Sequence, residues 1–340
     1  MSYELLCLIW FILLGILLAG YAVLDGFDLG VGILHPFVPK NDTERRLSMN
    51  SIGPLWDGNE VWLVTFGGAM FAMFPEAYKT IFSSFYTAFI LLLFALIFRA
   101  VSMEFRSKIK SPRWRHGWDY GFFIGSGLAS LLFGVAIGNG IRGIPLNDNH
   151  DYLAGLWYQL HPYNLMVGLM VVSMFAMHGG IYLYLKTEGD FQKRLEPIIW
   201  RLFFAFLAFF LIVTLWTLIA YPDATSLLQK HWWMGIVPVL NLLAIANIPR
   251  AMYKQMPGYA FISSSCSILA FVFLFGVAIF PNMVPSTIPG NSVTIYEASS
   301  ALTLKIGLLI VLLGMPCVLA YTAVIYWTFR GKVVLDDHSY

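Results

Sequence analysis

The sequence predicts an all-α, polytopic membrane protein with nine transmembrane helices. Of its 340 residues, 59% are hydrophobic and only 12% are charged, whereas about 25% of the residues in an average soluble domain are charged. Nine apolar segments approach the ~20 residues that a helix needs to cross a bilayer. The stretches between them are too short to form an independent core, so we expect a single integral membrane domain over residues 1–340.

The nine predicted spans follow one another along the whole chain. The N-terminus lacks the positively charged region of a cleavable signal peptide, so the first span should be retained as a helix. The seventh is short and contains Pro238 and Asn241, which makes it the least regular. The spans are residues 5–34, 51–74, 80–100, 118–139, 162–185, 200–220, 232–249, 258–280 and 303–329.

Lysine and arginine are sorted between alternate loops, which orients the chain. Cytoplasmic loops are enriched in these residues, and here the first, third, fifth and seventh loops and the C-terminal tail hold most of them. The even loops contribute only Lys79, Arg142, Lys230 and Lys305. This alternation predicts an outside N-terminus and an inside C-terminus.

Charge and cysteine content exclude several other classes of protein. The net charge of +2 is too small to predict nucleic-acid binding. The three cysteines, Cys7, Cys266 and Cys317, all lie in apolar stretches without CxxC spacing. They are therefore interpreted as packing residues, and neither disulfides nor a zinc site is expected.

Two pairs of acidic residues lie inside the first two apolar segments. Asp25 and Asp28 belong to the first, and Asp57 and Glu60 to the second. The i, i+3 spacing places both members of a pair on one helix face. Carboxylates inside a membrane are costly and usually functional, so these four residues are the candidate site.

The predicted helix ends place the two pairs at matching depths. Asp28 and Asp57 are each about six residues, or about 9 Å, from the inner end of their helix, and Asp25 and Glu60 lie at about 13 Å. Burial favours the protonated form of a carboxyl group, so such residues can take and release protons. The sequence thus predicts a ladder of acids near the cytoplasmic face, provided that the two helices turn these faces toward each other or toward a common neighbour.

A structural role for the acids is the alternative to a proton path. Each could cap a neighbouring backbone or pair with an arginine such as Arg99. Gly26 and Gly30 form a GxxxG spacing that allows helices to approach closely, and we interpret these glycines as packing residues.

The histidines do not favour a haem site in this chain. A haem between helices needs two axial ligands at similar depth on facing helices. Only His178 lies well inside a predicted span; five others lie at the boundaries, and His338 lies in the tail. We interpret His178 as a hydrogen-bonded packing residue, although its depth also suits the acidic cluster. No catalytic, cofactor-binding or metal-ligating residue is expected.

Three motifs resemble subunit II of the cytochrome bd-type quinol oxidases. They are LDGFDLG at residues 24–30, NDTERR at 41–46 and WDGNEVW at 56–62. Further similarity at residues 105–108, 113–119, 134–139 and 280–286 extends the match over residues 5 to 330.

The resemblance implies a bacterial inner-membrane oxidase whose subunit I carries haems b and d and the quinol site. This chain would be the haem-free subunit, with two four-helix bundles plus one helix, and it would support assembly. The bundles would correspond to a pseudo-repeat of residues 5–139 and 162–280, followed by the last helix at 303–329. The family's proton path matches Asp28 and Asp57, with Asp25 and Glu60 as supporting candidates. Small single-span subunits, membrane lipid and quinone remain open as further partners, and nucleic acid is not expected.

Two other functions remain open from the residues alone. A proton-coupled transporter would need inverted repeats and broken helices around a polar site near the midplane. A purely structural scaffold subunit would use its acids only for packing and pairing.

Overall fold

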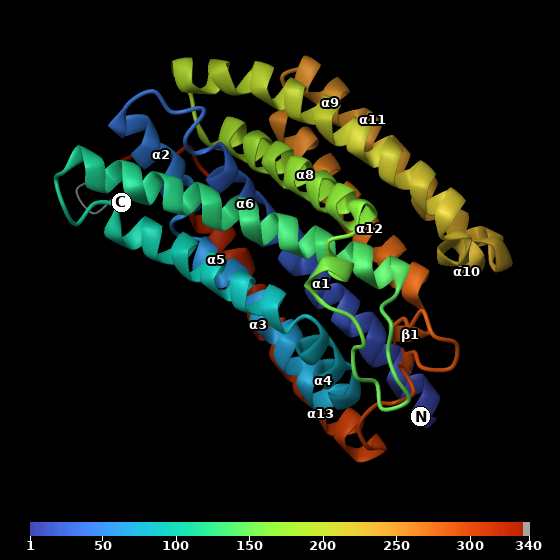
Figure 1. The fold of residues 1–340 in the computed structure, drawn as a ribbon. Helices are drawn as coiled ribbons and strands as arrows, with labels where there is room; N and C mark the ends of the chain where they lie inside the picture. The colour runs from blue at the N-terminus through green and yellow to red at the C-terminus, as the bar shows by residue number, and fades with distance from the viewer. Residues whose placement is uncertain (336–340) are drawn as a thin grey trace.

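Long helices run side by side through the molecule (Figure 1), in a computed structural model that describes residues 1–335. The prediction for His338 lies outside the described residues. Among the described helices, eight are long and apolar enough to cross a membrane. They are α1 (Tyr3–Leu34), α5 (Tyr86–Phe105), α6 (Pro112–Arg142), α8 (Pro162–Lys186), α9 (Gly189–Ala220), η2 (Trp232–Gly235) continued by α11 (Ile236–Tyr253), α12 (Pro257–Ile279) and α13 (Ala301–Thr328).

A further helix, α3 (Trp56–Met73), lies where the second span was expected. The polar side chains of Asp57, Asn59 and Glu60 at its start make it less apolar than the eight. A nine-span topology therefore stays a prediction.

The predicted start of the second span at residue 51 was wrong. A separate helix, α2 (Asp42–Ile52), occupies part of the first loop, and α3 begins only at Trp56. Pro54 lies between them, and proline both lacks a backbone N–H and disfavours helical geometry in the residue before it. Asp57 consequently lies in the first turn of α3 instead of about six residues inside the helix.

The third predicted span also begins differently in the structure. Residue 80 falls within a short helix, α4 (Pro75–Ser84), and α5 starts after a break at Phe85. Pro75 occupies the first turn of α4, where its missing N–H costs no hydrogen bond. The predicted seventh span is present as the helical stretch from Trp232 to Tyr253.

Small elements connect the long helices. They are α7 (Leu156–Gln159), η1 (Pro222–Thr225), α10 (Ser226–Lys230) and the strands β1 (Asn282–Val284) and β2 (Val293–Thr294). The strands pair antiparallel, with Asn282 opposite Thr294. Val284 and Val293 join a core cluster with Leu6 of α1, so this hairpin packs near the beginning of α1 (Figure 1).

The centre of the array is α8, which packs against α1, α6, α9 and α12. Glycines allow α1 and α8 to cross closely: a Cβ atom on Gly179 would lie 2.5 Å from the backbone carbonyl carbon of Gly30. This confirms the packing interpretation for Gly30. In contrast, one side of α13 packs against α1 and α3. Most of the apolar side chains of α13 are exposed.

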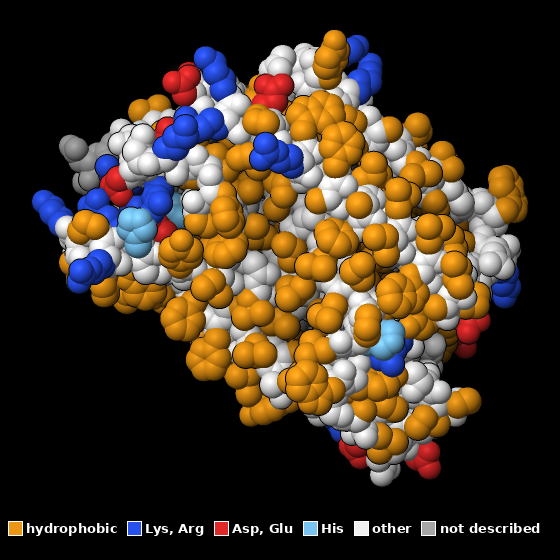
Figure 2. Space-filling model, turned by 45° about the horizontal axis from the view of Figure 1, so that its top comes forward, with side chains coloured by type: hydrophobic (Ala, Val, Ile, Leu, Met, Phe, Trp, Pro, Cys, Tyr) orange, Lys and Arg blue, Asp and Glu red, His pale blue; other side chains and the backbone are white. Residues whose placement is uncertain are grey.

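Hydrophobic side chains cover most of the middle of the face in Figure 2, and most charged side chains lie toward the ends. An exposed apolar surface of this extent is stable in contact with lipid or protein rather than water. Together with the eight apolar helices, it is the surface of a multi-pass membrane protein.

The α1–α8 crossing can be tested by adding one methyl group. We expect Gly179→Ala to lower the free energy of unfolding by about 1–3 kcal/mol, because backbone atoms of α1 occupy the space that the Cβ needs. Gly15→Ala is the matched control, since no atom lies within 4 Å of its ideal Cβ. Thermal unfolding of the purified protein measures both; equal stability of the two variants would contradict the close crossing.

Candidate functional site

Two carboxylates of α1 are completely buried in the protein, one helical turn apart. Asp25 and Asp28 each expose 0% of their surface. Arg99 of α5, itself buried, donates two hydrogen bonds to Asp25: Nη1 to Oδ2 at 2.9 Å and Nη2 to Oδ1 at 2.5 Å. This two-bond geometry is the strongest that an arginine makes with a carboxylate, and it neutralises Asp25.

Asp28 shares the same cation at a longer distance. Its Oδ2 lies 4.0 Å from Nη2 of Arg99, and Glu60 interacts electrostatically with Arg99 as well. One guanidinium thus faces a group of acidic side chains. Since Asp25 takes both hydrogen bonds, Asp28 is the buried carboxylate that is only partly compensated.

Asn59 of α3 donates a hydrogen bond to Asp28. Its Nδ2 donates to Asp28 Oδ2 at 2.7 Å and to the backbone oxygen of Leu24 at 3.2 Å, while its Oδ1 accepts from the hydroxyl of Tyr326 at 2.9 Å. Three helices, α1, α3 and α13, therefore meet in one chain of hydrogen bonds. Among the described residues, no partner reaches the other oxygen of Asp28, Oδ1.

A cavity of about 250 Å³ lies beside this chain of bonds. Asp57, Asn59 and Tyr326 all line it, together with apolar residues of α1, α3 and α13. Liquid water occupies about 30 Å³ per molecule, and a polar cavity of this size can hold several. The cavity joins the exposed carboxylate of Asp57 to the amide that touches Asp28.

The predicted ladder of four facing acids is only partly present. Asp25 and Asp28 lie together as expected, and Asp25 makes the ion pair with Arg99 that the structural alternative described. Asp57 is exposed and Glu60 half-buried, so α3 turns Asn59 rather than its acids toward Asp28. The i, i+3 rule placed Asp57 and Glu60 on one face, but it could not show which face packs against α1.

Sequence reasoning missed Asn59 and Tyr326 as site residues. Asn59 stands inside the WDGNEVW motif, two positions after Asp57. Two residues along a helix turn a side chain to nearly the opposite side, so the amide of Asn59 could have been recognised as the group that faces α1 when Asp57 does not. Tyr326 lies 267 positions away from Asn59 along the chain, and no local pattern connects them.

A second network of buried charges lies where α1 ends. Asp119 of α6 accepts hydrogen bonds from Arg106 Nε at 2.6 Å and from Arg45, and it contacts His35 Nε2 at 2.7 Å. Burial lowers the pKa of His35, despite the opposing attraction of Asp119.

Asp42 extends this network toward the surface. It accepts hydrogen bonds from Arg106 at 2.8 Å and from Arg115, which is not buried, at 2.9 Å. These bonds tie α2, α5 and α6 to the end of α1.

His178 uses both ring nitrogens in contacts within the protein. Nδ1 lies 2.7 Å from the Ser264 hydroxyl and Nε2 lies 3.2 Å from the backbone oxygen of Val23, while the ring stacks on Phe261. An axial haem ligand needs a free ring nitrogen, so His178 does not fit that role. Within residues 1–335, no group of three or more His, Cys, Asp or Glu side chains is arranged to hold a metal ion.

Known protein families and relatives match this chain over nearly its whole length. The family model for cytochrome bd terminal oxidase subunit II matches residues 6–329. The chain belongs to this family. Subunit 2 of the cytochrome bd-I ubiquinol oxidase of Escherichia coli strain K12 is 37% identical over 369 residues, covering 99% of this chain and 97% of the relative. Subunit 2 of the Bacillus subtilis cytochrome bd ubiquinol oxidase is 33% identical, covering 96% of each.

The fold agrees with this assignment. A chain of the bd oxidase structure from Geobacillus thermodenitrificans superposes with a TM-score of 0.77 at 15% sequence identity, covering 95% of this chain and 98% of the other. Our protein is thus a subunit of a cytochrome bd quinol oxidase, an oxidoreductase complex of aerobic respiration. Its place in a complex implies a partner subunit.

The Arg99–Asp25 pair should carry a large share of local stability. We expect Arg99→Met to cost about 3–5 kcal/mol, because it leaves a buried carboxylate without its cation. The double variant Asp25→Asn/Arg99→Met removes both charges and should regain much of this loss. Thermal unfolding of the complex compares them; a double variant that is no more stable than the single one would count against the pair.

Proposed function

We propose that this chain is the haem-free subunit of a bacterial inner-membrane quinol oxidase that reduces oxygen to water. In this proposal it supports assembly of a subunit that bears haems b and d, and it supplies part of a proton path from the cytoplasm. The observation that carries the proton path is the hydrogen bond from Asn59 to Asp28 in the wall of the cavity that Asp57 lines.

The proposed topology has nine spans, with α3 as the ninth, an outside N-terminus and an inside C-terminus. It rests on the alternation of lysine and arginine between loops. Helices α1, α3, α5 and α6 would form one four-helix bundle, and α8, α9, α11 and α12 the other, as two halves of a pseudo-repeat. Within the proposed bundles, α1 packs against α3 and α6, α5 against α6, α8 against α9 and α12, and α11 against α12, and α8 also packs against α1 and α6 of the other bundle. The additional helix is α13. The end of α1 near Leu34 then faces the cytoplasm.

Asp57 receives the proton in the proposed path. It is exposed in the first turn of α3, on the cytoplasmic side of the proposed topology. The helix N-terminus stabilises its negative charge. From there a proton can cross the cavity through water as far as Asn59, whose amide stands between the cavity and Asp28. In this proposal a local movement of Asn59 lets the proton reach Asp28, whose Oδ1 is free of protein partners among the described residues.

Asp25 and Arg99 have a positioning role in this proposal. Arg99 compensates the charge on the group of acids, while the two-bond pair with Asp25 holds the guanidinium in place. Asp28 is then the buried group that changes its protonation state. Glu60, which interacts with Arg99 and Asp57, stays a supporting candidate beside the path.

Proton uptake from the inner side makes the oxidase electrogenic. Separating charge across the membrane corresponds to about 2.3 kcal/mol for each proton per 100 mV. The haems, which the proposal assigns to the partner, would supply oxygen chemistry, and quinol the electrons. The residues of this chain bind and move protons toward that site.

The proton path predicts a specific effect of removing the acid at the cavity mouth. Asp57→Asn should slow oxidase turnover and proton uptake at neutral pH by about 10²-fold, in the range of a lost proton-transfer group, and leave the complex assembled. The matched control is Asp190→Asn, an exposed acid on α9, which should have no effect. Unchanged proton uptake in Asp57→Asn would refute the relay.

Two further measurements separate the rival functions from the proton path. In a purely structural scaffold, Asn variants of the acids would reduce assembly or the haem content of the partner before they affect proton uptake. A proton-coupled transporter would move solute when this chain alone is placed in liposomes.

Tyr326 should influence turnover through Asn59. Its hydroxyl donates to Asn59 Oδ1 and so keeps Nδ2 turned toward Asp28. We expect Tyr326→Phe to reduce turnover several-fold, because an amide without this donor can rotate; one such bond contributes about 1 kcal/mol. Tyr253→Phe, on the exposed surface of α11, is the control. Equal turnover in both variants would exclude a role for the Tyr326 hydroxyl.

A further inference from the structure

The last helix, α13, has few neighbours among the described parts of the chain. It packs against α1 and α3, and most of its apolar side chains are exposed. One polar side chain nevertheless makes α13 part of the candidate site, since the Tyr326 hydroxyl donates a hydrogen bond to Asn59 Oδ1 at 2.9 Å. The position of the end of α13 therefore decides whether Tyr326 reaches Asn59.

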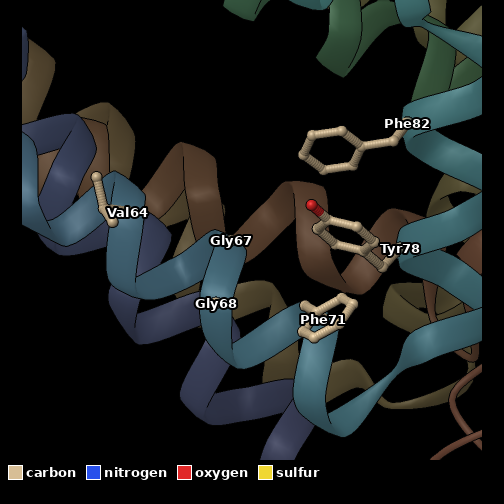
Figure 3. A pocket seen from close by; sticks show the side chains of 6 residues that line it. All are labelled: Val64, Gly67, Gly68, Phe71, Tyr78 and Phe82. Atoms are coloured by element: carbon tan, nitrogen blue, oxygen red, sulfur yellow. The ribbon is translucent and has the colours of Figure 1, made fainter.

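The far side of α3 does not fix this position within the described residues. An open groove of about 380 Å³ lies there, between α3 and α4. Because this side of α3 is open, the bond between Tyr326 and Asn59 needs a fixed point on α13 itself. Figure 3 shows the lining of the groove, which is apolar apart from one hydroxyl group and consists of Val64, Gly67, Gly68, Phe71, Tyr78 and Phe82.

A lysine at the end of α8 binds the chain directly after α13. The side chain of Lys186 is only 7% exposed. Its Nζ donates hydrogen bonds to the backbone oxygen of Phe329 and to that of Gly331, the latter at 3.2 Å. Phe329 follows the last residue of α13 and lies about one helical turn after Tyr326. The last carbonyl groups of a helix lack partners within it, and a lysine at this end also interacts favourably with the helix dipole.

The segment after α13 binds back to the end of α8. The backbone N–H of Val333 donates to the backbone oxygen of Lys186 at 3.0 Å, and Lys332 Nζ donates to the backbone oxygen of Thr187 at 2.8 Å. Since α8 is the central helix of the array, its end is a firm attachment point. We call Lys186, Thr187 and residues 329–333 the α8–α13 clamp.

The clamp is connected to α1 as well as to α8. Lys186 Nζ lies 5.8 Å from the centre of the Tyr182 ring, within the range of a cation–π contact. The Tyr182 ring stacks on Phe27 at 4.1 Å, and Phe27 directly precedes Asp28 in α1. The clamp thus fixes the end of α13 relative to the helix that carries Asp28.

We propose that Lys186 is a positioning residue for proton transfer, because it fixes the end of α13 and so keeps the Tyr326 hydroxyl bonded to Asn59. Without the ammonium group, the carbonyls of Phe329 and Gly331 lose their donor, and the end of α13 can move away from α3. The inference rests on the proposed proton path, in which Asn59 stands beside Asp28. It adds a residue of α8 that acts on this path only through α13.

Turnover of the intact oxidase tests the role of Lys186. Lys186→Met removes the donors while keeping a long side chain, and it should slow turnover several-fold, by no more than Tyr326→Phe does, at unchanged haem content of the complex. Lys186→Arg retains a cation with several donors and should keep most of the turnover. The matched control is Lys193→Met, which alters an exposed lysine on α9 and should have no effect.

A double variant separates positioning from general destabilisation. If Lys186 acts through Tyr326, Lys186→Met should slow turnover no further in a complex that already carries Tyr326→Phe. Independent effects of the two substitutions would instead multiply. A double variant slower than Tyr326→Phe by the full factor of Lys186→Met would overturn the proposal.

Hydrogen exchange of the intact complex measures the clamp itself. Lys186→Met should raise the backbone exchange rate of residues 325–333 several-fold, because their anchor on α8 is lost. Lys193→Met should leave these rates unchanged. Equal exchange in the two variants would show that Lys186 does not hold the end of α13, and the inference would fail.

The outcomes also distinguish this inference from the proton path. Normal turnover in Lys186→Met beside slow turnover in Tyr326→Phe would contradict the positioning role alone and leave the path standing. Unchanged proton uptake in Asp57→Asn would refute the path, and the positioning role with it, even if hydrogen exchange shows that the clamp exists.

Discussion

The two-bond ion pair between Arg99 and Asp25 is the interaction on which the inner half of the structure depends. It joins α5 to α1 inside a region where an unpaired charge is strongly destabilising. Because Asp25 takes both hydrogen bonds of the guanidinium, Asp28 one turn away remains close to a positive charge without being bound by it. In the proposed proton path, this fixed pair leaves Asp28 as the carboxylate that exchanges a proton.

The neighbourhood of Asp28 depends on helices far apart in sequence. Asn59 from α3 and Tyr326 from α13 complete the hydrogen bonds, and α1 supplies the carboxylate. Glycines let α1 approach α8 closely behind the site, and Asp119 with its arginines anchors the end of α1. Close packing on one side and charge pairing at the end hold Asp28 against the cavity wall. A proton path needs such fixed distances, and so would a scaffold that only stabilises the partner.

Much of this arrangement could be predicted from the sequence. Apolar length located the helices well, and the buried position of Asp25 and Asp28 followed from their place in the first span. The sequence also indicates Arg99 as a possible partner of the buried acids. The start of α3 was predicted incorrectly, because Gly53 and Pro54 interrupt a stretch whose composition otherwise fits one helix. The rotation of α3, which buries Asn59 and exposes Asp57, depends on packing against α1 and α13 and leaves no local signature.

In the proposed proton path, Asp28 changes its protonation state as the oxidase turns over. Redox-induced infrared difference spectroscopy of the intact complex measures this directly, through the carbonyl stretch of protonated carboxyl groups and its shift in deuterated water. If Asp28 exchanges protons, a carboxyl band should disappear in Asp28→Asn and persist in Asp190→Asn, which alters an exposed acid on α9. A difference spectrum that is the same with and without Asp28 would contradict it.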